Sequence, residues 1–126
     1  MVKNYLARRV GEPFVWGVCD CCTFALDWVV EQRGVDPMAA FRGRYDSRHS
    51  AAQVLQASGG FIPTVIATLQ AAGLLETMDP SVGDIGLIQT KSGPLLAIRG
   101  SAGWVAKSPG AGLCRAEFPV IRAWAV

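Results

Sequence analysis

Apolar positions in the first half of the chain recur every three or four residues, the spacing of helices that bury one face. Turn residues divide this half into four segments, and the pattern predicts helices over residues 3–10, 21–33, 50–58 and 61–73. The second is the most regular, because Asp20 precedes it as an N-cap and Gly34 ends it. Its inward face is expected to carry Cys21, Phe24, Ala25, Trp28 and Val29.

After Gly73 the pattern changes to short apolar runs separated by turn residues, which is typical of strands. It predicts strands over residues 83–89, 94–100, 103–108 and 119–126. The turns KSGP, GSAG and SPGAGL are too short to hold crossover helices, so we expect an antiparallel sheet. Helices followed by strands indicate an α+β fold. We expect one domain over residues 1–126, with a helical part at about 1–73 and a sheet part at about 82–126.

Composition narrows the function classes. With 126 residues the chain is long enough for one hydrophobic core. The apolar content of 51% is somewhat higher than a freely soluble monomer needs, which favours a surface that contacts a partner. The net charge of +2 gives no basic field, so we expect no nucleic-acid partner. No apolar run approaches the roughly 18 residues of a membrane span, and we expect synthesis in the cytoplasm.

Three cysteines within four positions stand where the second helix begins. Cys21 directly follows the Asp20 cap, in the first helical turn, where free backbone N–H groups and the helix dipole favour a thiolate. A catalytic cysteine also needs a base, and His49 is the only histidine of the chain. Cys21 and His49 are therefore the catalytic candidates, whereas the simpler interpretation of Cys21 is a small buried apolar residue.

The four cysteines permit another interpretation, a zinc or iron–sulfur site made by Cys19, Cys21, Cys22 and Cys114. Only Cys19 and Cys22 have the separation that paired zinc ligands usually show. We therefore expect no metal and no cofactor, and the four-cysteine site stays an alternative.

The motifs resemble those of the NlpC-type cell-wall peptidases, which are small papain-like cysteine amidases. Trp16-Gly17 matches their turn, Asp20-Cys21-Cys22 their helix start with Cys22 in place of serine, and residues 82–88 their Gly-Asp strand. The resemblance implies a papain-like fold. The next strand of that family carries the catalytic histidine, and its alignment with residues 94–100 puts Leu95 at that position. Loss of the general base costs at least about 10²–10⁴-fold in rate.

A second resemblance covers nearly the whole chain. The segments PFVWGxxDCCxFAxDWV, RGRYDS, GGF and RAWAV resemble a small phage and prophage family of unknown function. That family is encoded in tail modules of long-tailed phages and gene-transfer agents, where related phages encode an NlpC-type tail-tip peptidase. The resemblance implies a structural component of the tail tip or baseplate with a degenerate peptidase fold. It would be located in the virion and held by other tail proteins.

Two other functions stay open. One is an active cysteine amidase that cleaves peptidoglycan peptides during genome entry, with Cys21 as nucleophile and His49 or an imported group as base. The other is a tail-tip protein rigidified by the cysteine-ligated metal or iron–sulfur site. Among the tryptophans, Trp28 is expected in the core, and Trp104 and Trp124 either in the core or at an intersubunit face.

Overall fold

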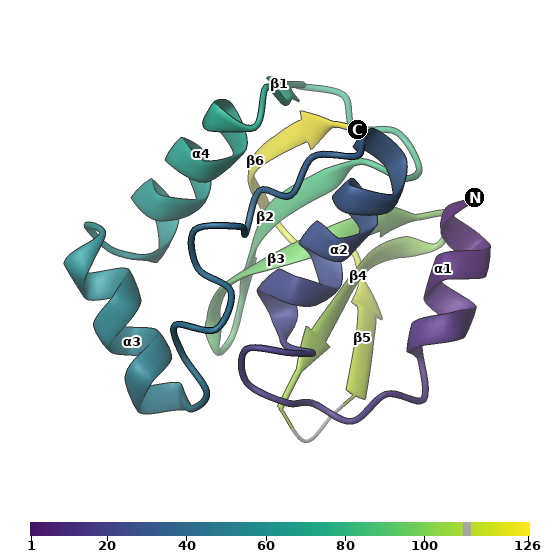
Figure 1. Cartoon of the computed structure of the whole chain (residues 1–126). Helices are drawn as coiled ribbons and strands as arrows, with labels where there is room; N and C mark the ends of the chain where they lie inside the picture. The colour runs from purple at the N-terminus through teal and green to yellow at the C-terminus, as the bar shows by residue number, and fades with distance from the viewer. Residues whose placement is uncertain (110–111) are drawn as a thin grey trace.

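The computed structural model describes residues 1–109 and 112–126. Within these residues the helices come first and the strands follow (Figure 1). The helices are α1 (Val2–Arg9), α2 (Cys21–Arg33), α3 (Arg48–Ala57) and α4 (Phe61–Ala71). The strands are β1 (Leu75–Glu76), β2 (Ile85–Thr90), β3 (Gly93–Gly100), β4 (Gly103–Ser108), β5 (Gly112–Ala116) and β6 (Val120–Ala125). The α+β class predicted from the sequence is confirmed.

The strands form one antiparallel sheet in the order β1-β6-β2-β3-β4-β5. The four predicted strands correspond to β2, β3, β4 and β6. The sequence pattern missed β1, which has two exposed residues, and β5, whose first two residues belong to the expected SPGAGL turn at 108–113. Residues 110–111 of that turn lie outside the described residues. Neither missed strand has the buried alternation that identifies a strand from sequence.

Helix α2 lies across the sheet, with α1 on one side of it and the α3–α4 pair on the other (Figure 1). It contacts β3 and β4, and its buried residues include Phe24, Trp28 and Val29. The indole Nε1 of Trp28 donates to the backbone oxygen of Gly83 at 2.7 Å, which fixes the helix to the segment before β2. Gly34 ends α2 in the left-handed conformation with φ of 68°, as a glycine C-cap does.

A second, smaller core lies on the opposite face of the sheet. Its buried members are Ile88, Ala97, Trp104, Ala106 and Ala123, and Phe118 packs against them. The Trp104 ring passes so close to Gly86 that a Cβ there would lie 2.5 Å from it. Trp104 and Trp124 are 1% and 0% exposed, so both are core residues and neither lies on an intersubunit face.

The connection between β5 and β6 requires the sheet to curl. Only residues 117–119 separate the two strands, whereas three strands lie between them in the sheet order. Four Cα steps reach at most about 14 Å, but a flat sheet would separate these strands by about 19 Å. The curled sheet brings Phe118 over the second core and closes it.

Within the part of the chain that the structure describes, no single helix is long and apolar enough to cross a membrane. Helices α3 and α4 reach such a length and composition only together, across a bend of 70°.

Candidate functional site

Asp20 organises the start of α2. Its Oδ1 accepts hydrogen bonds from the backbone N–H groups of Cys22 at 3.0 Å and Thr23 at 2.9 Å, which makes it the N-cap that the sequence predicts. Its Oδ2 accepts from the backbone N–H of Gly17 at 2.8 Å and from the Tyr45 hydroxyl at 2.6 Å. The carboxylate is 2% exposed, and these four donors satisfy it without a cation.

The Trp16-Gly17 turn is shaped to reach Asp20. Gly17 has φ of 83°, and a Cβ there would collide with the backbone oxygen of Tyr45. Glycine is therefore required both for the backbone conformation and for the close approach of the loop. Burial, with the hydrogen bond to Asp20, raises the pKa of Tyr45 far above its ordinary value, so its hydroxyl remains a donor.

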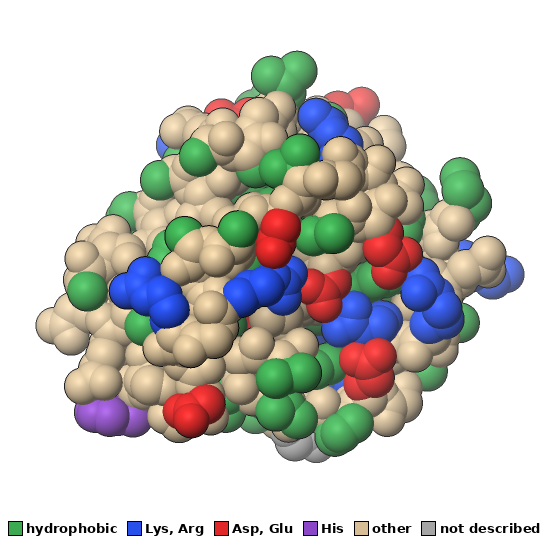
Figure 2. Space-filling model, viewed as in Figure 1, with side chains coloured by type: hydrophobic (Ala, Val, Ile, Leu, Met, Phe, Trp, Pro, Cys, Tyr) green, Lys and Arg blue, Asp and Glu red, His purple; other side chains and the backbone are tan. Residues whose placement is uncertain are grey.

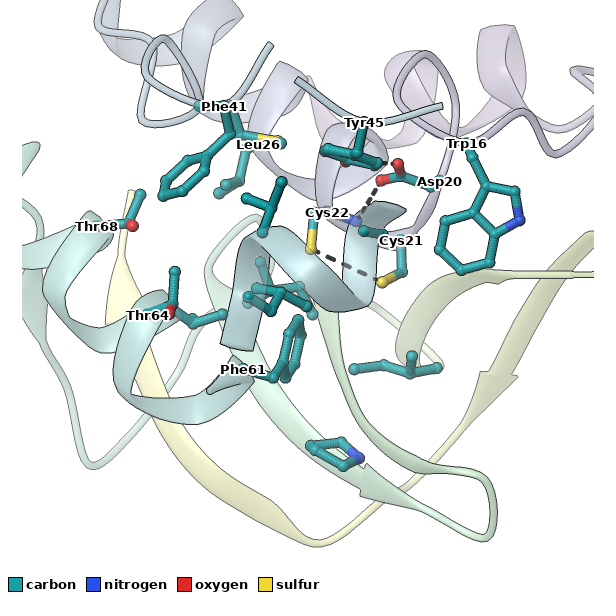
Figure 3. Close-up of a pocket in the computed structure, with 18 of the residues that line it drawn as sticks. Trp16, Asp20, Cys21, Cys22, Leu26, Phe41, Tyr45, Phe61, Thr64 and Thr68 are labelled. Carbon is teal, nitrogen blue, oxygen red and sulfur yellow. Dashed lines mark hydrogen bonds between the residues drawn. The ribbon is translucent and has the colours of Figure 1, made fainter. Parts of the chain in front are cut away.

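Cys21 and Cys22 present adjacent thiols in the first turn of α2. Their Sγ atoms are 3.9 Å apart, and both side chains are half-buried (Figure 3). The hydrogen bond to Cys21, followed by burial, raises the pKa of Cys22 well above that of a free thiol. Cys22 therefore stays protonated at neutral pH, whereas Cys21 is the thiol of the pair in the position of a nucleophile.

Both cysteines line a cavity of about 220 Å³ between α2, α3, α4 and the start of β3. Most other side chains on its wall are apolar. Trp16 and Thr68 lie at opposite ends of the cavity, with the two cysteines between them (Figure 3). Leu95 of β3 borders the same cavity, but its side chain packs against the second core on the other face of the sheet, where it pairs with Ile88. The residue that the sequence alignment puts at the position of a catalytic histidine thus borders the cavity of Cys21.

His49 is not part of this wall. It lies in the first turn of α3, is exposed, and stands at the edge of the molecule in Figure 2. The structure therefore does not join the two catalytic candidates in one site. Among the described residues that line the cavity there is no histidine or glutamate, and the one carboxylate, Asp20, is fully engaged by donors.

The four cysteines do not gather around one point. Cys19 is buried and its thiol donates to the Glu12 carboxylate at 3.2 Å, while Cys114 of β5 lies 3.2 Å from the Ser108 hydroxyl. In the described part of the chain, no group of three or more histidine, cysteine or acidic residues could hold a metal ion. The structure therefore does not bring the four cysteines together, and the bend of residues 15–19 turns Cys19 toward Glu12.

Glu12 and Cys19 belong to a polar cluster at the edge of the sheet. Arg9 donates through Nε to the Glu12 carboxylate at 2.8 Å, and the fully buried Lys107 of β4 donates to the Glu12 backbone oxygen. Burial alone raises the pKa of Glu12, but the hydrogen bonds from Cys19 and Arg9 outweigh it, and the pKa lies below the ordinary value.

In the loop after α2, Arg42 forms salt bridges with acidic side chains. This guanidinium binds Asp27 and Asp36, each at 2.7 Å, and Asp27 also binds Arg9 at 3.2 Å. Figure 2 shows basic and acidic side chains alternating across this face. Because both acidic groups bind it, Arg42 does not contribute to a basic patch on this face.

Two contributions to the site escape the sequence analysis. The first is Tyr45, because its contact with Asp20 joins segments 25 residues apart. The second is the side of α4 that faces the cavity. Its spacing was visible in the sequence, but an apolar helix face looks the same whether it meets a core or borders an empty space.

A family model described as a domain of unknown function, DUF6950, matches residues 1–126. The chain therefore belongs to this family. No curated protein and no solved structure matches it.

Proposed function

We propose that this member of the DUF6950 family is a non-catalytic protein with a papain-like, NlpC-type fold that serves as a structural component of a tail tip or baseplate. The particle would be a long-tailed phage or a phage-derived particle. In this role the chain is made in the host cytoplasm and incorporated into the virion. Other tail proteins are its partners, and it needs no cofactor.

The observation that carries the proposal is the cavity lined by Cys21, in whose described wall there is no histidine. A papain-like amidase needs an imidazole near its thiol, to take the thiol proton and return it to the leaving amine. The alignment with the NlpC-type peptidases puts Leu95 at the strand position of their catalytic histidine. Asp20 stabilises the helix start and Tyr45 remains a hydroxyl donor, so neither supplies the missing base.

The placement in a phage tail is supported by the sequence resemblance. Its segments are the ones that build the site: the Trp16-Gly17 turn, the Asp20 cap and the RGRYDS loop that brings in Tyr45. A protein that keeps this framework without the base retains the packing for which the residues are needed. The framework then serves assembly rather than hydrolysis.

An active peptidoglycan amidase is the second candidate, because Cys21 keeps the position of a nucleophile at the start of α2. It would need a base from a partner protein. Incubation of the purified chain with peptidoglycan, alone and within intact particles, separates the two functions. We expect the same release of peptides from the wild type and from Cys21→Ala. Cleavage that depends on Cys21 would overturn the non-catalytic assignment.

Mass spectrometry of purified particles tests the structural assignment. Particles produced by the strain that encodes the chain should contain it in a fixed ratio to the tail-tip proteins and retain it after a high-salt wash. Its absence from washed particles, with the soluble protein present in the lysate, would contradict the proposal.

A further inference from the structure

Helix α4 turns one continuous face toward the cavity. Its wall residues are Phe61, Thr64, Val65, Thr68 and Leu69, which follow the one-face spacing of a helix. The first and the last lie eight positions apart, so this face extends for about 12 Å along the helix axis. The cavity is therefore bordered by two full turns of helix and is longer than one side chain.

Helices α3 and α2 supply the facing walls without closing the space. Ala51, Val54 and Leu55 of α3 repeat the same spacing, and Cys22 and Leu26 lie one turn apart on α2. Protein interiors normally leave few voids larger than a water molecule. A space of about 220 Å³ between three apolar helix faces is larger than the roughly 150 Å³ of an engineered apolar cavity that binds benzene.

The polar groups of the wall are mostly satisfied within the protein. Asp20 accepts four hydrogen bonds, Tyr45 donates to Asp20, and the Thr64 hydroxyl donates to the backbone oxygen of Ser58 at 3.3 Å. Trp16 and Thr68 are half-buried, at the two ends of the cavity. A peptide entering the middle would lose hydrogen bonds to water without replacement, which is costly, whereas an apolar chain would lose none.

From this geometry we infer that the cavity between α2, α3 and α4 binds the aliphatic chain of a small amphiphile. At about 30 Å³ for a group of the size of a water molecule, the volume of about 220 Å³ holds a chain of about seven carbon atoms. The polar end of the amphiphile remains outside the cavity, near Trp16 or Thr68 at one of its ends. This inference goes beyond the tail role and does not depend on it.

A series of straight-chain carboxylates from four to twelve carbons, each below its micelle concentration, tests the inference by NMR titration of the full chain labelled with nitrogen-15. Each added methylene should tighten the dissociation constant about fourfold. This gain should stop near eight to ten carbons, where the cavity is full. The amide signals that shift should belong to the cavity walls of α3 and α4.

Two neighbouring alanines of α3 provide matched variants. Ala51 is buried on the cavity wall and Ala52 is exposed. Ala51→Leu should fill part of the space and weaken octanoate binding at least tenfold, whereas Ala52→Leu should leave it unchanged. The inference is overturned by non-saturable binding, by affinity independent of chain length, or by equal affinities of the two variants.

Discussion

Cys21 and Leu95 border one cavity, although one begins a helix and the other lies 74 residues later on a strand of the sheet. The sequence alignment pairs the same two residues as nucleophile and missing base. The spatial relationship is therefore open to a direct test by substitution.

Leu95→His puts an imidazole at a position that borders the cavity of Cys21. An imidazolium stabilises a neighbouring thiolate, so alkylation of Cys21 by iodoacetamide at pH 6.5 should be at least about tenfold faster than in the wild type. Peptide mass spectrometry of timed samples measures the rate at each cysteine.

Lys91→His is the matched control, because it adds an imidazole at an exposed position in the turn of the same β2–β3 hairpin. It should leave the Cys21 rate unchanged. Equal rates in the two variants would show that position 95 does not reach the thiol.

Cys22 should react more slowly than Cys21 in the wild type. The hydrogen bond to Cys21 and burial raise the pKa of Cys22. At pH 8 a smaller fraction of Cys22 is therefore thiolate than for an ordinary cysteine, and the thiolate is the form that reacts. The same alkylation series measures both positions, and the unfolded protein in urea serves as the reference in which they become alike. Faster labelling of Cys22 in the folded chain would contradict the assignment of Cys22 as the protonated thiol.

Asp20→Ala should destabilise the protein by at least about 2.5 kcal/mol. The variant loses an N-cap, worth about 0.5–2 kcal/mol. It also leaves the Gly17 N–H and the Tyr45 hydroxyl without an acceptor. Each buried group that loses its hydrogen-bond partner costs about 1–3 kcal/mol. Urea unfolding measures the free energy.

Ser47→Ala provides the comparison for Asp20→Ala, since Ser47 caps α3 with a single bond to the backbone N–H of Ser50 at 3.1 Å. It should cost only about 1 kcal/mol. If both variants lose the same free energy, the bonds of Asp20 to Gly17 and Tyr45 add nothing to stability.

Glu12→Gln should reduce the loss of the free energy of unfolding as the pH falls. The pKa of Glu12 is lower in the folded protein than in the unfolded chain, so the unfolded state takes up protons first as pH falls. The stabilisation is therefore complete above the unfolded pKa, near 4.3, and is lost as pH falls through the folded value. Because the Glu12 side chain is 42% exposed, the effect should be below about 1 kcal/mol.

Urea unfolding at pH 6 and at pH 3.5 measures this difference. The wild type should lose more stability over that interval than Glu12→Gln does. Parallel losses in the two proteins would contradict a lowered pKa at Glu12.

The strongest local signals in the sequence identified the right elements. Asp20 before an apolar helix and Gly34 after it fixed the limits of α2 to the residue, because caps act through adjacent backbone groups. The strand β1 gave no such signal. Its two exposed residues pair with Trp124 and Ala125 of β6, which lie far away in the chain.

The candidate site shows the same division. Cys21 could be placed at a helix start from the sequence alone, since its position depends on neighbours within the next turn. The apolar character of the cavity around Cys21 could not be predicted from the sequence. That property depends on how α3 and α4 come to rest against α2, and a tertiary arrangement leaves no mark on the spacing of Ala51 or Thr64 within their own helices.

The position of β6 between β1 and β2 has a consequence for the order of folding. The β2–β3, β3–β4 and β4–β5 pairs are hairpins of neighbouring segments and can form early, since their loops are short. Strand β6 must instead insert between two strands that precede β3, and only then is Trp124 sealed in the core. Contacts between distant segments slow folding. The insertion of β6 should therefore be the late step, in which the exposed edge of β2 gains its second partner.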